Sequence, residues 1–130
     1  MTLFEIVALY GAINIIFLIA LSYRVAGTRK KNSIGIGDGG DEALQRTIRV
    51  QGNFTEYTPM AIIGLLLMAG LNADPYWLHA LGIAFTLGRV LHAIGFSGNS
   101  GVSFGRLAGM VLTWGSLLVM ALYLLYKVIT

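Results

Sequence analysis

The chain has 130 residues, of which 56% are hydrophobic and only 12% are charged, and its mean hydropathy is +0.75. Soluble domains carry about 25% charged residues, so this composition indicates an integral membrane protein with one helical domain over residues 1–130. The chain has no cysteine, which excludes disulfides, thiolate metal ligands and a cysteine nucleophile. Its two histidines are far apart and form no His-Glu-x-x-His pattern, so we expect no metal site.

Four apolar segments predict four membrane-spanning helices, at about residues 3–25, 42–70, 76–96 and 106–127. Each segment reaches the roughly 20 residues that a helix needs to cross the hydrocarbon core. The polar stretches between them are short and leave no room for a second domain. The expected fold is therefore an all-α membrane protein, a four-transmembrane-helix bundle.

Basic residues are concentrated between the first two apolar segments. They are Arg24, Arg29, Lys30, Lys31, Arg46 and Arg49. Because cytoplasmic loops are enriched in Lys and Arg, we expect an inner-membrane protein whose 26–41 and 97–105 loops face the cytoplasm. This pattern explains the net charge of +3 better than nucleic-acid binding does, and it also attracts anionic membrane lipid.

Polar residues gather in the first half of the second segment. Arg46, Arg49, Asn53 and Glu56 follow one another at offsets of three, four and three, which places all four on one helical face. A charged side chain facing lipid costs about 2.5–3.5 kcal/mol, so such residues normally face the protein interior and mark a site. An interhelical salt-bridge network that only assembles the bundle is the structural alternative. Pro59 follows in the same helix and predicts a kink.

The third and fourth segments bring further basic residues to the same end of the bundle. Arg89 and His92 share one face of the third segment, and Arg106 opens the fourth. Because successive helices alternate in direction, Arg49, Arg89 and Arg106 all fall at the predicted cytoplasmic end. Glu56 is the expected partner of Arg89, but its single negative charge cannot neutralise three arginines. We therefore expect a negatively charged ligand there, while His92 alone is more simply a packed histidine.

Residues 49–59, RVQGNFTEYTP, resemble a motif of the MAPEG family, the membrane-associated proteins of eicosanoid and glutathione metabolism. Residues 87–92, LGRVLH, are similar to the third-helix segment of that family, and the resemblance covers essentially the whole chain. The chain looks like a small bacterial member, similar to microsomal glutathione transferase and to the leukotriene-forming synthase. The resemblance implies a homotrimer that binds glutathione, as co-substrate, between neighbouring subunits.

The resemblance also implies roles for individual residues. By position, glutathione would be bound by Arg29, Arg49, Asn53, Glu56, Tyr57, Arg89 and His92. In this set Glu56 would take the amino group and an arginine would take a carboxylate. Arg106 would be the catalytic residue, because it matches the arginine that stabilises the glutathione thiolate. A nearby arginine and a helix N-terminus both favour a thiolate over a thiol, whose pKa is otherwise about 8.5.

Three positions depart from the family pattern. Phe96 stands where several members have tyrosine, and Leu107 and Met110 replace a serine and a tyrosine of the prostaglandin-forming branch. The isomerase activity of that branch is therefore disfavoured. The expected function is a membrane-bound glutathione transferase or peroxidase that acts on lipophilic electrophiles or hydroperoxides. A non-catalytic protein that binds glutathione or lipid is the alternative, and a transporter is weakly supported because the chain has no internal repeat.

Overall fold

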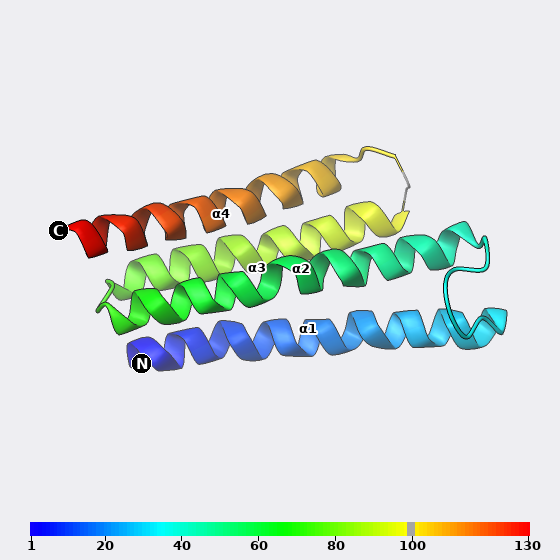
Figure 1. Cartoon of the computed structure of the whole chain (residues 1–130), viewed down its shortest axis with the longest axis horizontal. Helices are drawn as coiled ribbons and strands as arrows, with labels where there is room; N and C mark the ends of the chain where they lie inside the picture. The colour runs from blue at the N-terminus through cyan, green and yellow to red at the C-terminus, as the bar shows by residue number, and fades with distance from the viewer. Residues whose placement is uncertain (99–100) are drawn as a thin grey trace.

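The protein, seen in a computed structural model that describes residues 1–98 and 101–130, consists of four helices laid side by side (Figure 1). They are α1 (Leu3–Asn32), α2 (Glu42–Gly70), α3 (Pro75–Gly98) and α4 (Phe104–Ile129). Both termini and the α2–α3 turn lie at one end, and the α1–α2 and α3–α4 connections lie at the other, which we call the loop end (Figure 1). This architecture confirms the predicted all-α four-helix bundle.

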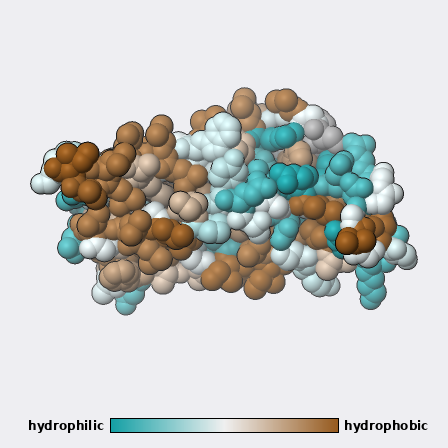
Figure 2. Space-filling view, in the orientation of Figure 1, coloured by the Kyte–Doolittle hydropathy of each residue, from teal (hydrophilic) through white to brown (hydrophobic). Residues whose placement is uncertain are grey.

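Of the helices in the described part of the chain, three, α1, α3 and α4, are long and apolar enough to cross a membrane. They expose large apolar side chains such as Ile16 and Trp114, as expected of helices that contact lipid. The first half of α2 is polar instead, because it carries the predicted charged face. In Figure 2 hydrophilic side chains gather toward the loop end and hydrophobic ones toward the termini. The chain is therefore an integral membrane protein with one polar end.

Two buried apolar clusters hold the helices together. The larger includes Ile6, Leu65, Leu78 and Met120, one from each helix. The second contains Leu21, Val50, Phe54 and Ala93, from the first three helices. Because lipid tails are as apolar as these side chains, close van der Waals packing rather than escape from water holds such clusters together.

The first helix is longer than the predicted span. Residues 26–32, expected to belong to a loop, are helical. Basic residues fill the last turn of α1, where a positive charge interacts favourably with the helix C-terminus. Ser33 ends the helix in a left-handed conformation with φ of 53°, and its N–H donates to the carbonyls of Arg29 and Lys30. Only the glycine-rich residues after this point form the connection.

Short polar side chains start the two helices that follow the loops. The Asp41 carboxylate accepts a hydrogen bond from the Leu44 N–H at 2.7 Å, as an N-cap does. Ser103 caps α4 in the same way, accepting from the Arg106 N–H at 3.2 Å. The predicted 97–105 loop is thus shorter than expected, since its first two and last two residues are helical. Its residues 99 and 100 lie outside the described residues.

Glycines allow α3 and α4 to approach each other closely. A Cβ atom added at Gly109 would lie 2.6 Å from the carbonyl oxygen of Gly88, and one added at Gly88 would lie 2.9 Å from the carbonyl oxygen of Gly109. Small residues at helix contacts are the usual means of close approach inside a membrane. This contact sets how near Arg89 on α3 lies to Thr113 on α4.

Gly109→Ala is expected to lower the free energy of unfolding by about 1–3 kcal/mol, because the new methyl group would meet backbone atoms of α3 that cannot rotate away. Thermal unfolding in detergent measures this loss. Gly115→Ala is the matched control on the same helix, since nothing lies within 4 Å of its added Cβ. That variant should be unchanged or stabilised by up to about 1 kcal/mol. Equal unfolding temperatures for the two variants would contradict the close helix contact.

Candidate functional site

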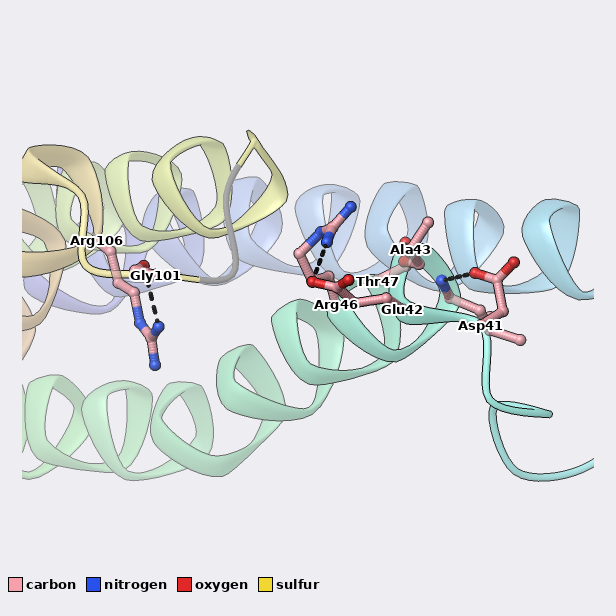
Figure 3. Close-up of polar contacts among 8 residues, drawn as sticks. Asp41, Glu42, Ala43, Arg46, Thr47, Gly101 and Arg106 are labelled. Carbon is pink, nitrogen blue, oxygen red and sulfur yellow. Dashed lines mark hydrogen bonds and ion pairs between the residues drawn. The ribbon is translucent and has the colours of Figure 1, made fainter.

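A cavity of about 330 Å³ lies at the loop end, between the start of α2, the end of α3 and the start of α4. Its lining residues are Glu42, Gln45, Arg46, Arg49, Phe96 and Arg106. We call this cavity the polar cleft. Figure 3 shows the side chain of Arg106 extending from the start of α4 toward α2. The cleft therefore brings together two of the arginines that the sequence placed at one end, Arg49 and Arg106.

Arg106 is positioned by contacts on both sides of its side chain. Its guanidinium carbon lies 4.2 Å from the centre of the Phe96 ring, a cation–π distance. Its Nη1 donates to the Gly101 carbonyl at 3.4 Å (Figure 3). Arg106 also belongs to the first turn of α4, where the helix N-terminus carries partial positive charge. Guanidinium and helix terminus together create a place that favours an anion.

Two ion pairs lie on α2, and each includes an arginine that lines the polar cleft. Arg46 pairs with Glu42 at 3.0 Å, and Arg49 pairs with Glu56 at 3.3 Å. The Arg49 and Glu56 side chains are 53% and 52% exposed. Exposed pairs of this kind contribute about 0–1 kcal/mol. A ligand carboxylate that binds Arg49 through two hydrogen bonds can therefore replace this pair at little cost.

Arg89 lies behind the polar cleft, in the interior of the bundle, and is 1% exposed. Its Nη1 donates to the Asn53 side-chain oxygen at 2.6 Å, and its Nε donates to the Thr113 hydroxyl at 2.9 Å. The sulfur of Met110 lies 3.4 Å from Nη2, and the Tyr57 ring centre lies 5.3 Å from the guanidinium carbon. Arg89 therefore connects α3 to both α2 and α4.

The predicted ion pair between Glu56 and Arg89 is wrong, because Glu56 pairs with Arg49 instead. The α2 side chain that accepts a hydrogen bond from Arg89 is Asn53, one helical turn closer to the loop end than Glu56. Burial of the Glu56 carboxylate beside Arg89 would cost that carboxylate its hydration. Glu56 stays half exposed and keeps water around its charge.

His92 and Arg29 do not line the polar cleft. His92 is buried, and its ring stacks on Phe96 with centroids 5.7 Å apart, so it supports the cleft wall from behind. Arg29 lies in the last turn of α1 and donates to the Gly37 carbonyl at 2.7 Å. It lines a separate surface cavity at that helix end. Within one chain the structure therefore leaves Arg29 apart from the other predicted residues.

A second cavity, of about 440 Å³, begins at Glu56 and Tyr57 and continues between α2 and α4. Beyond those two residues its lining is apolar and includes Met60, Gly64, Leu67, Leu117, Met120 and Leu124. We call it the α2–α4 groove. Because Glu56 pairs with Arg49, one ion pair links a wall of the polar cleft to the mouth of this groove.

Thr113 was not identified by sequence reasoning as part of this region. It accepts from Arg89, and its own hydroxyl donates to the Gly109 carbonyl at 2.8 Å. A threonine inside an apolar run carries little signal by itself. Thr113 follows Arg106 by seven residues, so both lie on one helical face. This spacing was the one signal in the sequence that could have placed Thr113 near the site.

The described residues form four helices, and three of these helices are apolar enough to cross a membrane. A cleft lined by arginines lies at one end. These features define a polytopic helical membrane protein with a cationic site. In the described part of the chain no group of three or more His, Cys, Asp or Glu residues is placed to bind a metal ion. Residues 7–126 match the MAPEG family, and the chain belongs to this family.

Two bacterial proteins are similar to this chain over most of its length. The chain is 36% identical over 115 residues to the inner membrane protein YecN of Escherichia coli K12, covering 88% of this chain and 86% of that protein. It is also 36% identical over 84 residues to the protein sll1147 of Synechocystis, covering 61% of each. The predicted resemblance to a small bacterial member of the family is thereby confirmed.

Proposed function

We propose that the protein is a membrane-bound glutathione transferase or peroxidase. Glutathione binds in the polar cleft as its thiolate, and a lipophilic electrophile or hydroperoxide enters the α2–α4 groove from the bilayer. Membership of a family of glutathione and eicosanoid metabolism supports this proposal. The observation that carries it is the Arg49–Glu56 ion pair, which joins a cationic cleft to an apolar groove.

The chemistry of glutathione matches the charges of the polar cleft. The tripeptide carries two carboxylates, one ammonium group and one thiol. Arg49 offers a guanidinium to a carboxylate, Glu56 offers a carboxylate to the ammonium group, and Arg106 stabilises the thiolate. Tyr57 completes the predicted set from the start of the α2–α4 groove, and Asn53, Arg89 and His92 support the site without lining the cleft. A contact with Arg29 requires a neighbouring subunit, because Arg29 lies apart from the cleft within one chain.

Both proposed reactions use the thiolate as nucleophile. In the transferase reaction, the sulfur forms a bond to an electrophilic carbon and a leaving group such as chloride departs. In the peroxidase reaction, the sulfur takes the terminal oxygen of a hydroperoxide, and the alkoxide leaves and is protonated to an alcohol. A second glutathione then converts the sulfenic acid to a disulfide and water. In each case the polar cleft positions the thiolate beside the apolar groove, and positioning supplies much of the rate.

The test is glutathione binding to the protein purified in detergent, followed by the ultraviolet absorbance of the thiolate at neutral pH. The parent protein should bind glutathione and show a thiolate band, whereas S-methylglutathione should bind without one. Arg49→Ala should weaken binding by about 10- to 100-fold, because a charge-assisted hydrogen bond is lost. Arg24→Ala is the control, since Arg24 contacts Ser97 outside the polar cleft. Binding without a thiolate band would favour a non-catalytic glutathione-binding protein, and no binding would refute the proposal.

We also propose that the protein assembles as a homotrimer with glutathione between neighbouring subunits. The resemblance within the family supports this arrangement, as does the separation of Arg29 from the polar cleft in one chain. Native mass spectrometry of the protein released from detergent should give three times the 14.0 kDa of one chain. A mass of one or two chains would contradict the trimer.

The loop end is proposed to face the cytoplasm, because basic residues lie near it. The natural chain has no cysteine, so Ile36→Cys introduces a single thiol at a side chain that is 91% exposed. In spheroplasts a membrane-impermeant maleimide should label this thiol only after lysis. Tyr76→Cys, at an exposed position near the opposite end, should be labelled before lysis. The reverse pattern would place the loop end outside.

A further inference from the structure

Arginines that line the polar cleft are Arg46, Arg49 and Arg106, and Arg46 has no role in the chemistry proposed above. Glutathione bound as its thiolate carries three negative groups: the α-carboxylate of its glutamyl residue, the carboxylate of its glycine, and the sulfur. Arg106 is assigned to the sulfur and Arg49 to one carboxylate. The second carboxylate therefore still needs a cation.

The Arg49–Glu56 ion pair fits the glutamyl end of the tripeptide. The ammonium group and the α-carboxylate of that residue are attached to the same carbon atom, so they lie side by side. Arg49 Nη1 and Glu56 Oε1 also lie side by side, 3.3 Å apart. A zwitterion of this kind can replace the ion pair by binding both of its members. The glycine carboxylate, at the other end of the tripeptide, must then bind elsewhere.

Two other arginines of the predicted set are poorly placed for the glycine carboxylate. Arg89 is 1% exposed and donates to Asn53 and Thr113, so a ligand in the cleft does not reach it. Arg29 lines a separate cavity at the end of α1 and would have to come from a neighbouring subunit. Within one chain, Arg46 is the cleft arginine that remains for this carboxylate.

Arg46 is placed to reach the glycine end of the tripeptide. It precedes Arg49 by three residues, so both lie on the same face of α2 with their Cβ atoms about 5–6 Å apart. The Arg46 side chain is 26% exposed and pairs with Glu42 at 3.0 Å (Figure 3). Because the Glu42 side chain is 69% exposed, this ion pair is weak. A ligand carboxylate can therefore displace Glu42 from Arg46.

We propose that Arg46 binds the glycine carboxylate of glutathione and makes the site selective for the complete tripeptide. This assignment rests on the proposed function, in which glutathione occupies the polar cleft. Both ends of the tripeptide then lie along α2, with the glycine end one helical turn nearer the loop end than the glutamyl end. The thiolate between them faces Arg106 on α4. Each negative group of the ligand thus meets one arginine.

The test compares glutathione with its glycine amide, in which a neutral carboxamide replaces the glycine carboxylate and the rest of the tripeptide is unchanged. Both ligands are titrated calorimetrically into the full-length protein in detergent. The parent protein should bind glutathione about 10- to 100-fold more tightly than the amide, as one charge-assisted hydrogen bond allows. Arg46→Gln should bind the two ligands with affinities that agree to within about twofold, because the cation that distinguishes them is absent.

Two further variants separate Arg46 from its neighbours. Arg49→Gln is the matched control on the same helical face, and it should weaken binding of both ligands while keeping the preference for glutathione. Glu42→Gln removes the carboxylate that competes for Arg46. It should raise the affinity for glutathione by about two- to fivefold, and by more than it raises the affinity for the amide. This gain keeps the assignment testable if Arg46→Gln does not fold.

The outcomes distinguish this assignment from the proposed function. Equal affinity of the parent protein for the two ligands would overturn the assignment, and so would a preference for glutathione that persists in Arg46→Gln. Loss of the preference in Arg29→Gln but not in Arg46→Gln would assign the glycine carboxylate to a neighbouring subunit instead. If the parent protein bound neither ligand, the proposed function itself would be refuted.

Discussion

Arg106→Ala is expected to lower kcat/KM for glutathione conjugation by about 100- to 1,000-fold, the loss that follows removal of one group stabilising a developing or bound anion. In the polar cleft Arg106 combines a guanidinium with the N-terminus of α4, and both favour the thiolate over the thiol. The variant leaves the helix terminus in place but removes the charge. The thiolate absorbance of bound glutathione at neutral pH should fall with the rate, and both quantities are measured on the same preparation.

Two further variants show whether the Arg106 guanidinium or only its charge is required. Arg106→Lys keeps a positive charge but loses the planar group that stacks on Phe96, so an intermediate rate is expected. Arg24→Ala removes an arginine that donates to Ser97 and does not line the cleft, so its rate should match the parent. Measurement of the thiolate absorbance at saturating glutathione distinguishes a variant that binds glutathione weakly from one that binds it without forming the thiolate. A full thiolate band in Arg106→Ala at saturation would assign activation to another group.

Arg89→Ala is expected to cause the largest loss of stability, about 3–5 kcal/mol in the free energy of unfolding. Truncation would open a cavity between three helices and would leave the Asn53 oxygen and the Thr113 hydroxyl without their donor. Arg89 is 1% exposed, so water cannot replace these hydrogen bonds without entering the bundle. Equilibrium unfolding in detergent, followed by circular dichroism, measures the loss.

Arg49→Ala is the matched control for stability, because it removes an arginine from the same end of the bundle. Its ion pair with Glu56 is about half exposed, so the expected loss is at most about 1 kcal/mol. Arg89→Met should lower the free energy of unfolding less than Arg89→Ala, because methionine fills most of the volume of the arginine. Neither variant replaces the hydrogen bonds of Arg89. If Arg49→Ala destabilised the protein as much as Arg89→Ala, the assignment of Arg89 as the structural arginine would be wrong.

The class of protein, and the end of the bundle at which its polar residues gather, could both be predicted from the amino-acid sequence. Long apolar segments predicted four helices because a membrane admits few other structures, and the structure contains them. The motif of residues 49–59 predicted the family, which the match over residues 7–126 confirmed. These predictions succeeded because hydropathy and helical spacing depend on residues close together in the chain. The roles of the predicted glutathione-binding residues stay predictions.

The contacts between polar side chains of different helices could not be predicted from the sequence and follow from how the helices pack. Offsets of three and four residues place Asn53 and Glu56 on nearby parts of one helix, but they do not say which neighbouring helix each one faces. Close contact of α3 with α4 puts Arg89 between Asn53 and Thr113, so Glu56 remains outside with Arg49. The hydrogen bond from Asn14 on α1 to Thr86 on α3 likewise depends on where these two helices meet. Such pairings depend on how rigid helices pack against one another, and no single segment contains that information.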